Sequence, residues 1–192
     1  ADMSNISKEN DGYTFLLTCV DVLSRYAWVI PVRSKAAPHM LAAVRQLFKQ
    51  AAPRKPIRFQ TDRGKEFYNA LVRKFLHDRG VELFSTNSDH KAAIVERFNR
   101  TLKARIYKYF TATNTRRYID VLADMVHSYN HSRHRTIGRK PADVVTQKDG
   151  DAVWRRVYYD SKEANLWRAD AHATNTGNAA HVGGLARLSR WK

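Results

Sequence analysis

The sequence predicts a mixed α/β domain, and two patterns together with the composition support this fold class. Short apolar runs of strand length alternate with segments in which apolar residues recur every three or four positions, as on one buried face of a helix. The resulting order, strand-strand-helix-strand-helix-strand-helix-helix, is typical of a sheet flanked by helices. Hydrophobic residues make up 43% and aromatic residues 11% of the 192 positions, which is enough to form a core, so wholesale disorder is excluded.

The first half is predicted to begin with two antiparallel strands. Residues 13–22 and 26–32 are rich in apolar, β-branched and aromatic residues, and only three residues separate them. Pro38 is suited to the first turn of a helix, and Met40 and Val44 belong to the buried face of that helix. The elements that follow are a strand at 57–60, a helix at 71–77 that ends before Gly80, and a strand at 81–84.

The second half is predicted to be mainly helical. A polar loop at 85–91 leads into the longest helix, at about 92–110, and another helix follows at about 115–129. From Pro141 onward the periodic pattern weakens, and the last ten residues alternate like a single strand. We therefore expect a core domain over residues 1–146, a linker or extension over 147–181, and a further strand region over 182–192.

The charge and the single cysteine limit the class of protein. The chain carries 34 Lys and Arg residues against 18 Asp and Glu residues, and this net charge of +16 favours a polyanionic partner such as nucleic acid. Cys19 alone cannot form an intramolecular disulfide or a cysteine-built zinc site, and a reducing compartment fits. No apolar run reaches the roughly 18 residues that a membrane span needs, so no membrane partner is expected.

Two motifs point to metal and phosphate chemistry. Asp62 lies in the sequence QTDRGKEF, at the carboxyl end of a predicted strand, where open α/β sheets place their ligands. One face of the longest predicted helix carries, at spacings i, i+3, i+4 and i+7, the residues Glu96, Asn99, Arg100 and Lys103. No acidic residue occurs in the 23 positions after Glu96, although seven are basic. Glu96 is therefore suited to hold a divalent metal ion beside a phosphate backbone.

Each motif alone also has an ordinary structural explanation. A carboxylate after a strand is often a turn residue or a helix N-cap, and Glu beside Arg and Lys at helical spacing is often a solvated face. His127, His131 and His134 could face one metal if their helix continued that far, but no carboxylate or HExxH pattern accompanies them, so packing or phosphate contact is favoured. No GxxxxGK, GxGxxG or GxSxG pattern indicates a nucleotide cofactor or a serine nucleophile.

Taken together, the motifs resemble the catalytic cores of retroviral-type integrases and DDE transposases, and most closely the integrases of Maverick/Polinton elements. The matching stretches lie within residues 2–146 and read NDGYTFLLTCVDVLSRYAWVIPV, QTDRGKEFYN, KAAIVERFNRTLK and SYNHSRHRTIGRKPADV. The resemblance implies an RNase H-like fold in which three carboxylates bind two Mg²⁺ or Mn²⁺ ions. Asp62 would be the second carboxylate and Glu96 the third, with 33 residues between them. The DNA end would be held by Asn99, Arg100 and Lys103.

The resemblance leaves two assignments open for the first carboxylate. Asp2 is the only early candidate before the predicted strand pair, and it would complete a catalytic and metal-binding set of Asp2, Asp62 and Glu96. In Maverick-type integrases this segment often reads D-x-x-D-M, in which the ligand precedes the Asp-Met pair by three residues. If Asp2 and Met3 are that pair, the ligand lies before the first residue of this sequence. Asp21 resembles a family aspartate that is not a metal ligand.

The resemblance further implies that residues 182–192 begin a truncated C-terminal small β-barrel. The expected function is that of a DNA integrase core, a polynucleotidyl transferase and endonuclease that acts on DNA as a homo-oligomer in the nucleus. Two alternatives stay open: a non-catalytic or domesticated DNA-binding module of the same fold, and a plain RNase H-like nuclease that cuts without joining. Intact Asp62 and Glu96 favour catalysis, and the basic helix favours binding of a DNA end.

Overall fold

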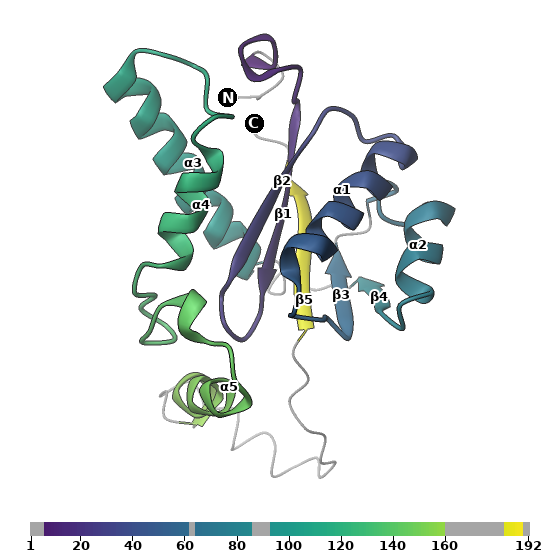
Figure 1. Cartoon of the computed structure of the whole chain (residues 1–192), viewed down its shortest axis with the longest axis vertical. Helices are drawn as coiled ribbons and strands as arrows, with labels where there is room; N and C mark the ends of the chain where they lie inside the picture. The colour runs from purple at the N-terminus through teal and green to yellow at the C-terminus, as the bar shows by residue number, and fades with distance from the viewer. Residues whose placement is uncertain (1–5, 62–63, 86–92, 160–182, 190–192) are drawn as a thin grey trace.

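The computed structural model forms one five-stranded sheet with helices on both faces (Figure 1). It describes residues 6–61, 64–85, 93–159 and 183–189, and for 159 and 183–189 it describes the backbone alone. Within these residues, no helix is both long enough and apolar enough to cross a bilayer. The elements in chain order are η2 (Lys8–Asn10), β1 (Phe15–Asp21), β2 (Ala27–Val32), α1 (Ala37–Ala51), β3 (Arg58–Thr61), α2 (Ala70–His77), β4 (Glu82–Ser85), α3 (Ala93–Thr113), α4 (Leu122–Asn130), η4 (Pro141–Asp143), α5 (Gln147–Trp154), η5 (Arg155–Tyr159) and β5 (Gly183–Ser189).

The sheet joins an antiparallel pair to a parallel pair through a middle strand. Its order is β2-β1-β5-β3-β4. β1 is antiparallel to both of its neighbours, with Cys19 opposite Trp28 of β2 and Val20 opposite Leu185 of β5. β3 is parallel to β4 and to β5, and Gln60 lies opposite Leu185 from the other side. Among the described strands no ladder joins β1 directly to β3, so the two halves of the sheet meet through β5.

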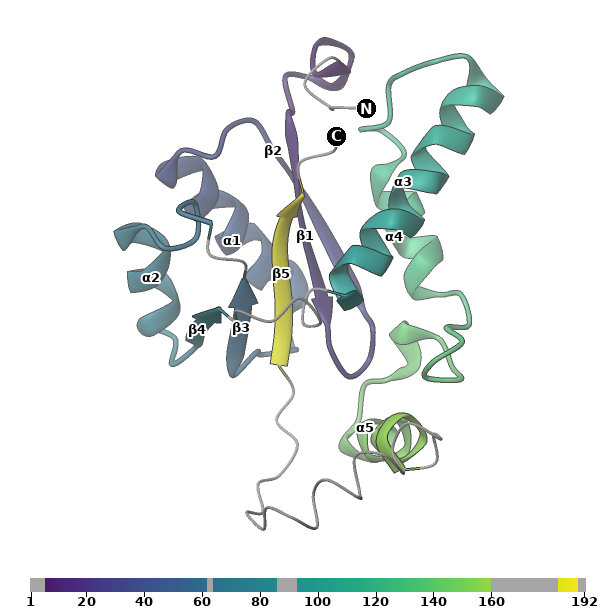
Figure 2. The same cartoon turned by 180° about the vertical axis from the view of Figure 1, so that it is seen from behind.

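Both faces of β1 are buried, so this strand separates two hydrophobic cores. Leu17 and Cys19 belong to the core that α1 and α2 cover. Leu16 and Val20 belong to the core that α3 and α4 cover on the opposite face (Figures 1 and 2). Burial on both sides explains why the sequence of β1 is an almost continuous apolar run instead of an alternating one.

The C-terminal strand corrects the prediction of a small β-barrel beginning at 182–192. Gly183–Ser189 is the middle strand of the same sheet, with backbone partners on both β1 and β3. A short alternating segment can pair with any free strand edge, and here β1 and β3 each provide one. The segment 147–154, at the start of the predicted linker, forms α5, which a capping box between Thr146 and Asp149 begins.

The helix predicted at 115–129 begins later than expected, because α4 spans Leu122–Asn130. The cause is the buried side chain of Asn10. Its Oδ1 accepts hydrogen bonds from the backbone N–H groups of Tyr118 at 2.8 Å and Ile119 at 3.1 Å. These donors are therefore bound to Asn10 in a turn that precedes the helix. The boundaries of the four strands predicted before residue 85 agree with the structure within two residues.

Leu185→Pro is expected to lower the free energy of unfolding by about 1–3 kcal/mol, the cost of leaving a buried backbone group without its hydrogen-bond partner. The backbone of Leu185 lies between Val20 and Gln60, and proline cannot donate the ladder hydrogen bond that a middle strand needs. Urea denaturation followed by circular dichroism measures the loss. The matched control is Leu185→Val, which keeps the backbone N–H and should cost about 1 kcal/mol. Equal stability of the two variants would contradict the position of β5 in the sheet.

Candidate functional site

Asp62 directly follows β3 and lies outside the described residues, but the chain on either side of it is held in place. Thr61, the last residue of β3, is buried, and the carboxyl ends of the parallel strands β3 and β4 meet at one edge of the sheet. After Asp62, the carboxylate of Glu66 pairs with Lys35 at 2.8 Å, and its backbone carbonyl accepts a hydrogen bond from Asn69. The described residues on either side of Asp62 are therefore held in place.

Glu96 lies in the first turn of α3, and its side chain is exposed. The buried stripe of the same helix consists of Val95, Phe98, Leu102 and Ile106. Burial of this stripe against the sheet fixes the rotation of α3 about its axis, so the polar residues at the predicted spacing point away from the core. Beside the exposed Glu96, this polar side carries Arg100, which is exposed, and two half-buried residues, Asn99 and Lys103.

β5 is a neighbour of both elements that flank the candidate carboxylates in sequence, β3 before Asp62 and α3 with Glu96. β5 pairs with β3, which Asp62 follows, and α3 packs against β5 from the other side (Figure 2). Residues 183–189 read GGLARLS and contain no carboxylate, so this strand supplies no metal ligand of its own. Asp2, the remaining candidate, lies outside the described residues. Within the described part of the chain, no group of three His, Cys, Asp or Glu residues could hold a metal ion.

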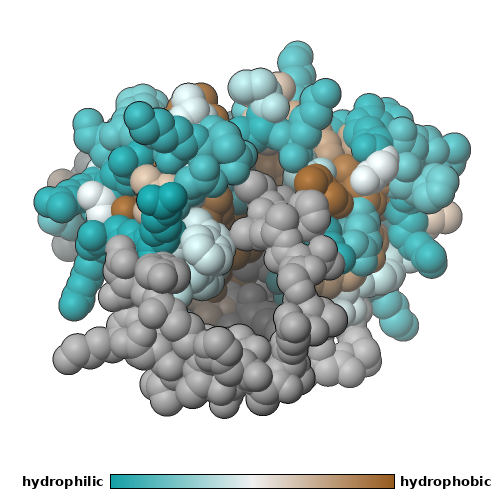
Figure 3. All heavy atoms as spheres, turned by 90° about the horizontal axis from the view of Figure 1, so that it is seen from below, coloured by the Kyte–Doolittle hydropathy of each residue, from teal (hydrophilic) through white to brown (hydrophobic). Residues whose placement is uncertain are grey.

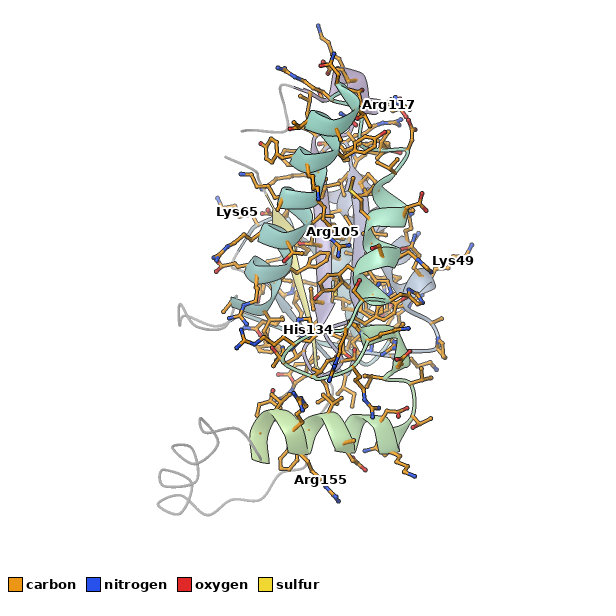
Figure 4. All side chains as sticks on the ribbon, turned by 90° about the vertical axis from the view of Figure 1, so that its left-hand side faces the viewer. Lys49, Lys65, Arg105, Arg117, His134 and Arg155 are labelled. Carbon is orange, nitrogen blue, oxygen red and sulfur yellow. The ribbon has the colours of Figure 1, made fainter. Side chains whose placement is uncertain are left out.

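The basic stretch after Glu96 divides into side chains that hold the fold together and side chains that remain exposed. Arg105 points from α3 toward α4 (Figure 4) and donates a hydrogen bond of 2.8 Å to a backbone carbonyl of that helix. Arg117 forms ion pairs with the carboxylates of Asp11 and Asp120. Arg105 and Arg117 therefore contribute to the packing of the fold. The exposed basic side chains of the stretch are Arg97, Arg100, Lys108 and Arg116.

The three histidines considered as a metal site do not converge on one point. The rings of His127 and His131 stack with their centroids 3.9 Å apart, and Nδ1 of His131 lies 2.9 Å from the carbonyl oxygen of His127. His134 instead packs its ring edge-on against Tyr129, with centroids 6.2 Å apart. These contacts are those of packing and helix termination.

The sequence analysis missed Arg25, a buried cation in the turn between β1 and β2. Only 8% of its surface is exposed, and burial lowers the pKa of its guanidinium. Asp21 is close in sequence, but its carboxylate accepts hydrogen bonds from the backbone N–H groups of Leu23 and Ser24 and so closes the turn. The only local signal for Arg25 is its position in a short turn between two strands, and that position does not reveal which other element covers the turn.

A cavity of about 690 Å³ lies on the other face of the sheet, between the C-terminal end of α1 and α5. Its floor is apolar, and Figure 3, which views this end of the molecule, shows hydrophobic residues (brown) between hydrophilic ones. Cys19 lies in its wall, and burial raises the pKa of that thiol. Because α3 covers the opposite face, the cavity is not part of the site around Glu96.

The folded state is expected to lose stability through His134 as the pH falls below about 6.5. Burial, followed by the charges of Arg25 and Arg97, lowers the pKa of this imidazole below its ordinary value of 6.5. Between that lowered pKa and 6.5 the unfolded chain binds more protons than the folded chain, so acid favours unfolding. Urea midpoints at about pH 7.5 and about pH 5.5 should therefore differ less in His134→Gln than in the wild type. His39→Gln, on the exposed face of α1, should behave as the wild type; the same pH response in all three proteins would refute the lowered pKa.

Comparison with known proteins finds sequence similarity to an integrase family model and to two transposon-related proteins. Residues 1–91 match the family model of the integrase core domain. A transposon-derived protein of Caenorhabditis elegans is 46% identical over 142 residues, which are 74% of this chain and 49% of that protein. The retrovirus-related Pol polyprotein from transposon 297 of Drosophila melanogaster is 22% identical over 160 residues, which are 78% of this chain and 15% of the polyprotein. The chain thus spans about half or less of the length of these curated relatives.

Solved structures share the fold. The HTLV-2 integrase catalytic core domain in complex with magnesium has a TM-score of 0.58 at 18% identity, over 68% of this chain and 84% of that one. The catalytic core domain of BIV integrase has a TM-score of 0.57 at 17% identity, over 68% and 85% of the two chains. A simian T-cell lymphotropic virus intasome in complex with the PP2A regulatory subunit B56 gamma has a TM-score of 0.62 at 15% identity, over 70% and 49%. The chain therefore shares the α/β fold of these integrase catalytic core domains, as predicted.

Proposed function

We propose that this chain is the catalytic core of a DNA integrase, which cleaves DNA 3′ ends and joins them to target DNA in a metal-dependent reaction. The observation that carries the proposal is the exposed Glu96 at the head of the basic helix α3, across β5 from the strand that Asp62 follows. The integrase core match over residues 1–91 includes Asp62 and supports the same class of reaction. The sequence resemblance places the proposed integrase nearest to those of Maverick/Polinton elements.

The donors of the chain fit a hard divalent metal ion. Asp62 and Glu96 are carboxylates, which Mg²⁺ and Mn²⁺ prefer as ligands, and the Glu96 side chain is exposed where a phosphate backbone could approach. The third carboxylate of the proposed set is Asp2 or a residue that precedes it. When bound, two such ions supply Lewis-acid stabilisation of the attacking and leaving oxygens of an in-line displacement.

The chain itself would bind and orient the DNA end along α3. Asn99 and Lys103 follow Glu96 by about one and two helical turns, and Arg100 is exposed beside them. The ammonium of Lys103 lies over the ring of Tyr107, 5.7 Å from its centroid, which limits where that charge can point. Because no covalent enzyme intermediate is formed in the proposed reaction, such orientation is the main contribution of these side chains.

The proposed partners are the DNA ends of the element, target DNA and further copies of the chain, in the nucleus. The net charge of +16 supports a polyanionic partner. The HTLV-2 integrase catalytic core has a trimeric and a dimeric form, and the simian T-cell lymphotropic virus protein forms an intasome. These assemblies support an oligomer for this chain too.

A non-catalytic DNA-binding module is the second candidate, and one observation favours it. β5, the middle strand of the sheet, contains no carboxylate. Of the three proposed metal ligands, Glu96 is the one that lies among the described residues. A chain with too few ligands would bind DNA through α3 without cutting it. An assay that separates cleaved from joined DNA distinguishes this module, a plain nuclease and an integrase.

Glu96→Gln and Asp62→Asn are each expected to lower Mn²⁺-dependent strand transfer by about 10²–10⁴-fold, because each removes a metal ligand. A labelled DNA end incubated with a target plasmid measures cleavage and joining on one gel. The matched controls are Glu82→Gln on β4 and Asp124→Asn on α4, two exposed carboxylates on other elements. Activity within about threefold of wild type in either site variant, with normal controls, would sink the assignment.

Asp2→Asn extends the same assay to the first ligand. A loss comparable to that of Asp62→Asn would assign Asp2 as the first carboxylate. Wild-type activity in Asp2→Asn would place that ligand elsewhere. Wild-type protein that binds DNA but neither cuts nor joins it would support the non-catalytic module.

DNA binding is expected to weaken steeply as salt rises. If about six phosphates are neutralised, the logarithm of the association constant should fall with the logarithm of the salt concentration at a slope near −5. Lys103→Ala should make this slope shallower by about one unit. Lys49→Ala should leave it unchanged, because Lys49 points away from α3 (Figure 4). Fluorescence anisotropy of a labelled duplex measures both, and a slope near zero would indicate a protein partner instead.

A further inference from the structure

The turn between β1 and β2 meets the ends of α3 and α4 at a tightly bonded junction. Asn130, the last residue of α4, donates a hydrogen bond to the carbonyl of Ala27 and accepts one from its N–H, both at 2.9 Å. Tyr129, next to Asn130, packs against Phe98 of α3 with ring centroids 4.8 Å apart. Arg25 lies two residues before Ala27, its side chain is buried, and Tyr129 is among the groups that act on its guanidinium.

Two further basic side chains, of His134 and Arg97, lie near Arg25. His134 packs edge-on against Tyr129 and lies on the side of the molecule formed by α3 and α4 (Figure 4). Arg97 precedes Phe98 on α3 and is exposed. The charges of Arg25 and Arg97 both act on His134, and that of Arg97 acts on Arg25, so the three side chains lie within electrostatic reach of one another. Three basic groups thus meet beside the Glu96 end of α3.

The guanidinium of Arg25 lacks a negative partner among the described residues. It takes part in none of their ion pairs, and its Nη1 is buried without a hydrogen-bond partner. Asp21, the acidic group that acts on it, is engaged by the backbone of the turn. Nδ1 of His134 is likewise buried without a partner.

The buried guanidinium of Arg25, which has no negative partner among the described residues, lowers the stability of the folded protein when no ligand is bound. A guanidinium stays protonated inside proteins, so Arg25 cannot avoid the cost of burial by losing its charge. An unpaired buried charge is strongly unfavourable, and a second cation beside it adds repulsion. An anion bound at this junction would pair Arg25, accept a hydrogen bond from the imidazole of His134, and offset the charge of Arg97.

We propose that Arg25, Arg97 and His134 form a binding site for one phosphate group of the DNA backbone. This assignment rests on the proposed DNA-binding function. A phosphodiester fits because its oxygens accept hydrogen bonds from a guanidinium and an imidazole at the same time. Two exposed residues lie near this junction and bring it within reach of solvent. Arg97 is exposed, and Tyr158, which is among the groups that affect the pKa of Arg25, is 44% exposed. Since Arg97 directly follows Glu96, the bound phosphate would be a near neighbour of the one at the proposed metal site.

The first arm of the test measures thermal unfolding with and without inorganic phosphate. In phosphate-free buffer, Arg25→Gln should unfold at the same temperature as the wild type or higher, because it removes an unpaired buried charge. Added phosphate should raise the unfolding temperature of the wild type and of the Lys49→Gln control, but not that of Arg25→Gln. Arg25→Lys, which keeps the charge without the planar fork, should retain part of the response.

The second arm measures the affinity for a short DNA duplex in EDTA, where a failure of metal-dependent chemistry has no effect. Arg25→Gln should weaken binding by about 10- to 100-fold, the loss expected for a hydrogen bond to a charged group. Lys49→Gln removes the same charge from the far side of the sheet and should weaken binding by less than about threefold.

Three outcomes would overturn the proposal. If Arg25→Gln lowers the unfolding temperature in phosphate-free buffer and leaves the phosphate response unchanged, Arg25 is a structural cation. If the phosphate response disappears but DNA affinity matches that of Lys49→Gln, the ligand is free phosphate. If the wild type binds no DNA, the proposed function fails as well, and the phosphate arm, which uses no DNA, still reports whether an anion site exists.

Discussion

The burial of β1 on both faces is the constraint on which the rest of the structure depends. Leu16, Leu17 and Val20 are completely buried, and a strand is paired along each edge of β1. A strand with two apolar faces requires a covering layer on each side, which α1 with α2 and α3 with α4 provide. α3 packs against the sheet through one stripe of apolar residues, so its polar residues lie on the side of the helix that faces away from the core.

The same packing decides which charges are exposed and which are buried. The chain reverses direction directly after β1, and the carboxylate of Asp21 accepts the backbone hydrogen bonds that close that turn. Two hydrogen bonds between Asn130 and Ala27 hold the end of α4 beside the start of β2, and Arg25 in the preceding turn is buried. Glu96 escapes this burial because it lies on the polar side of α3. The exposed carboxylate and the buried cation are two results of one arrangement of helices on the sheet.

Local patterns predicted the elements, and distant contacts decided what the sequence could not predict. The exposed face of Glu96 and Arg100 was predictable because a helical spacing is repeated within a few residues. The position of 183–189 was not, since an alternating segment does not specify which edge it pairs with. The late start of α4 depends on Asn10, more than 100 residues away in sequence. Arg25 was missed for the same reason: its burial depends on α4, which no pattern near Arg25 reveals.

The distribution of charge links stability to binding in this fold. Exposed arginines on α3 cost the free protein little, because water solvates them, but Arg25 is held where water does not reach its Nη1. A ligand that pairs Arg25 is bound by the folded chain alone, since the unfolded chain does not assemble Arg25, Arg97 and His134. DNA binding would therefore stabilise the fold by an amount that grows with the logarithm of the DNA concentration relative to the dissociation constant. On this view the junction of β1, α3 and α4 is weakest in the free protein and strongest in the complex, whether or not the chain also carries a complete set of metal ligands.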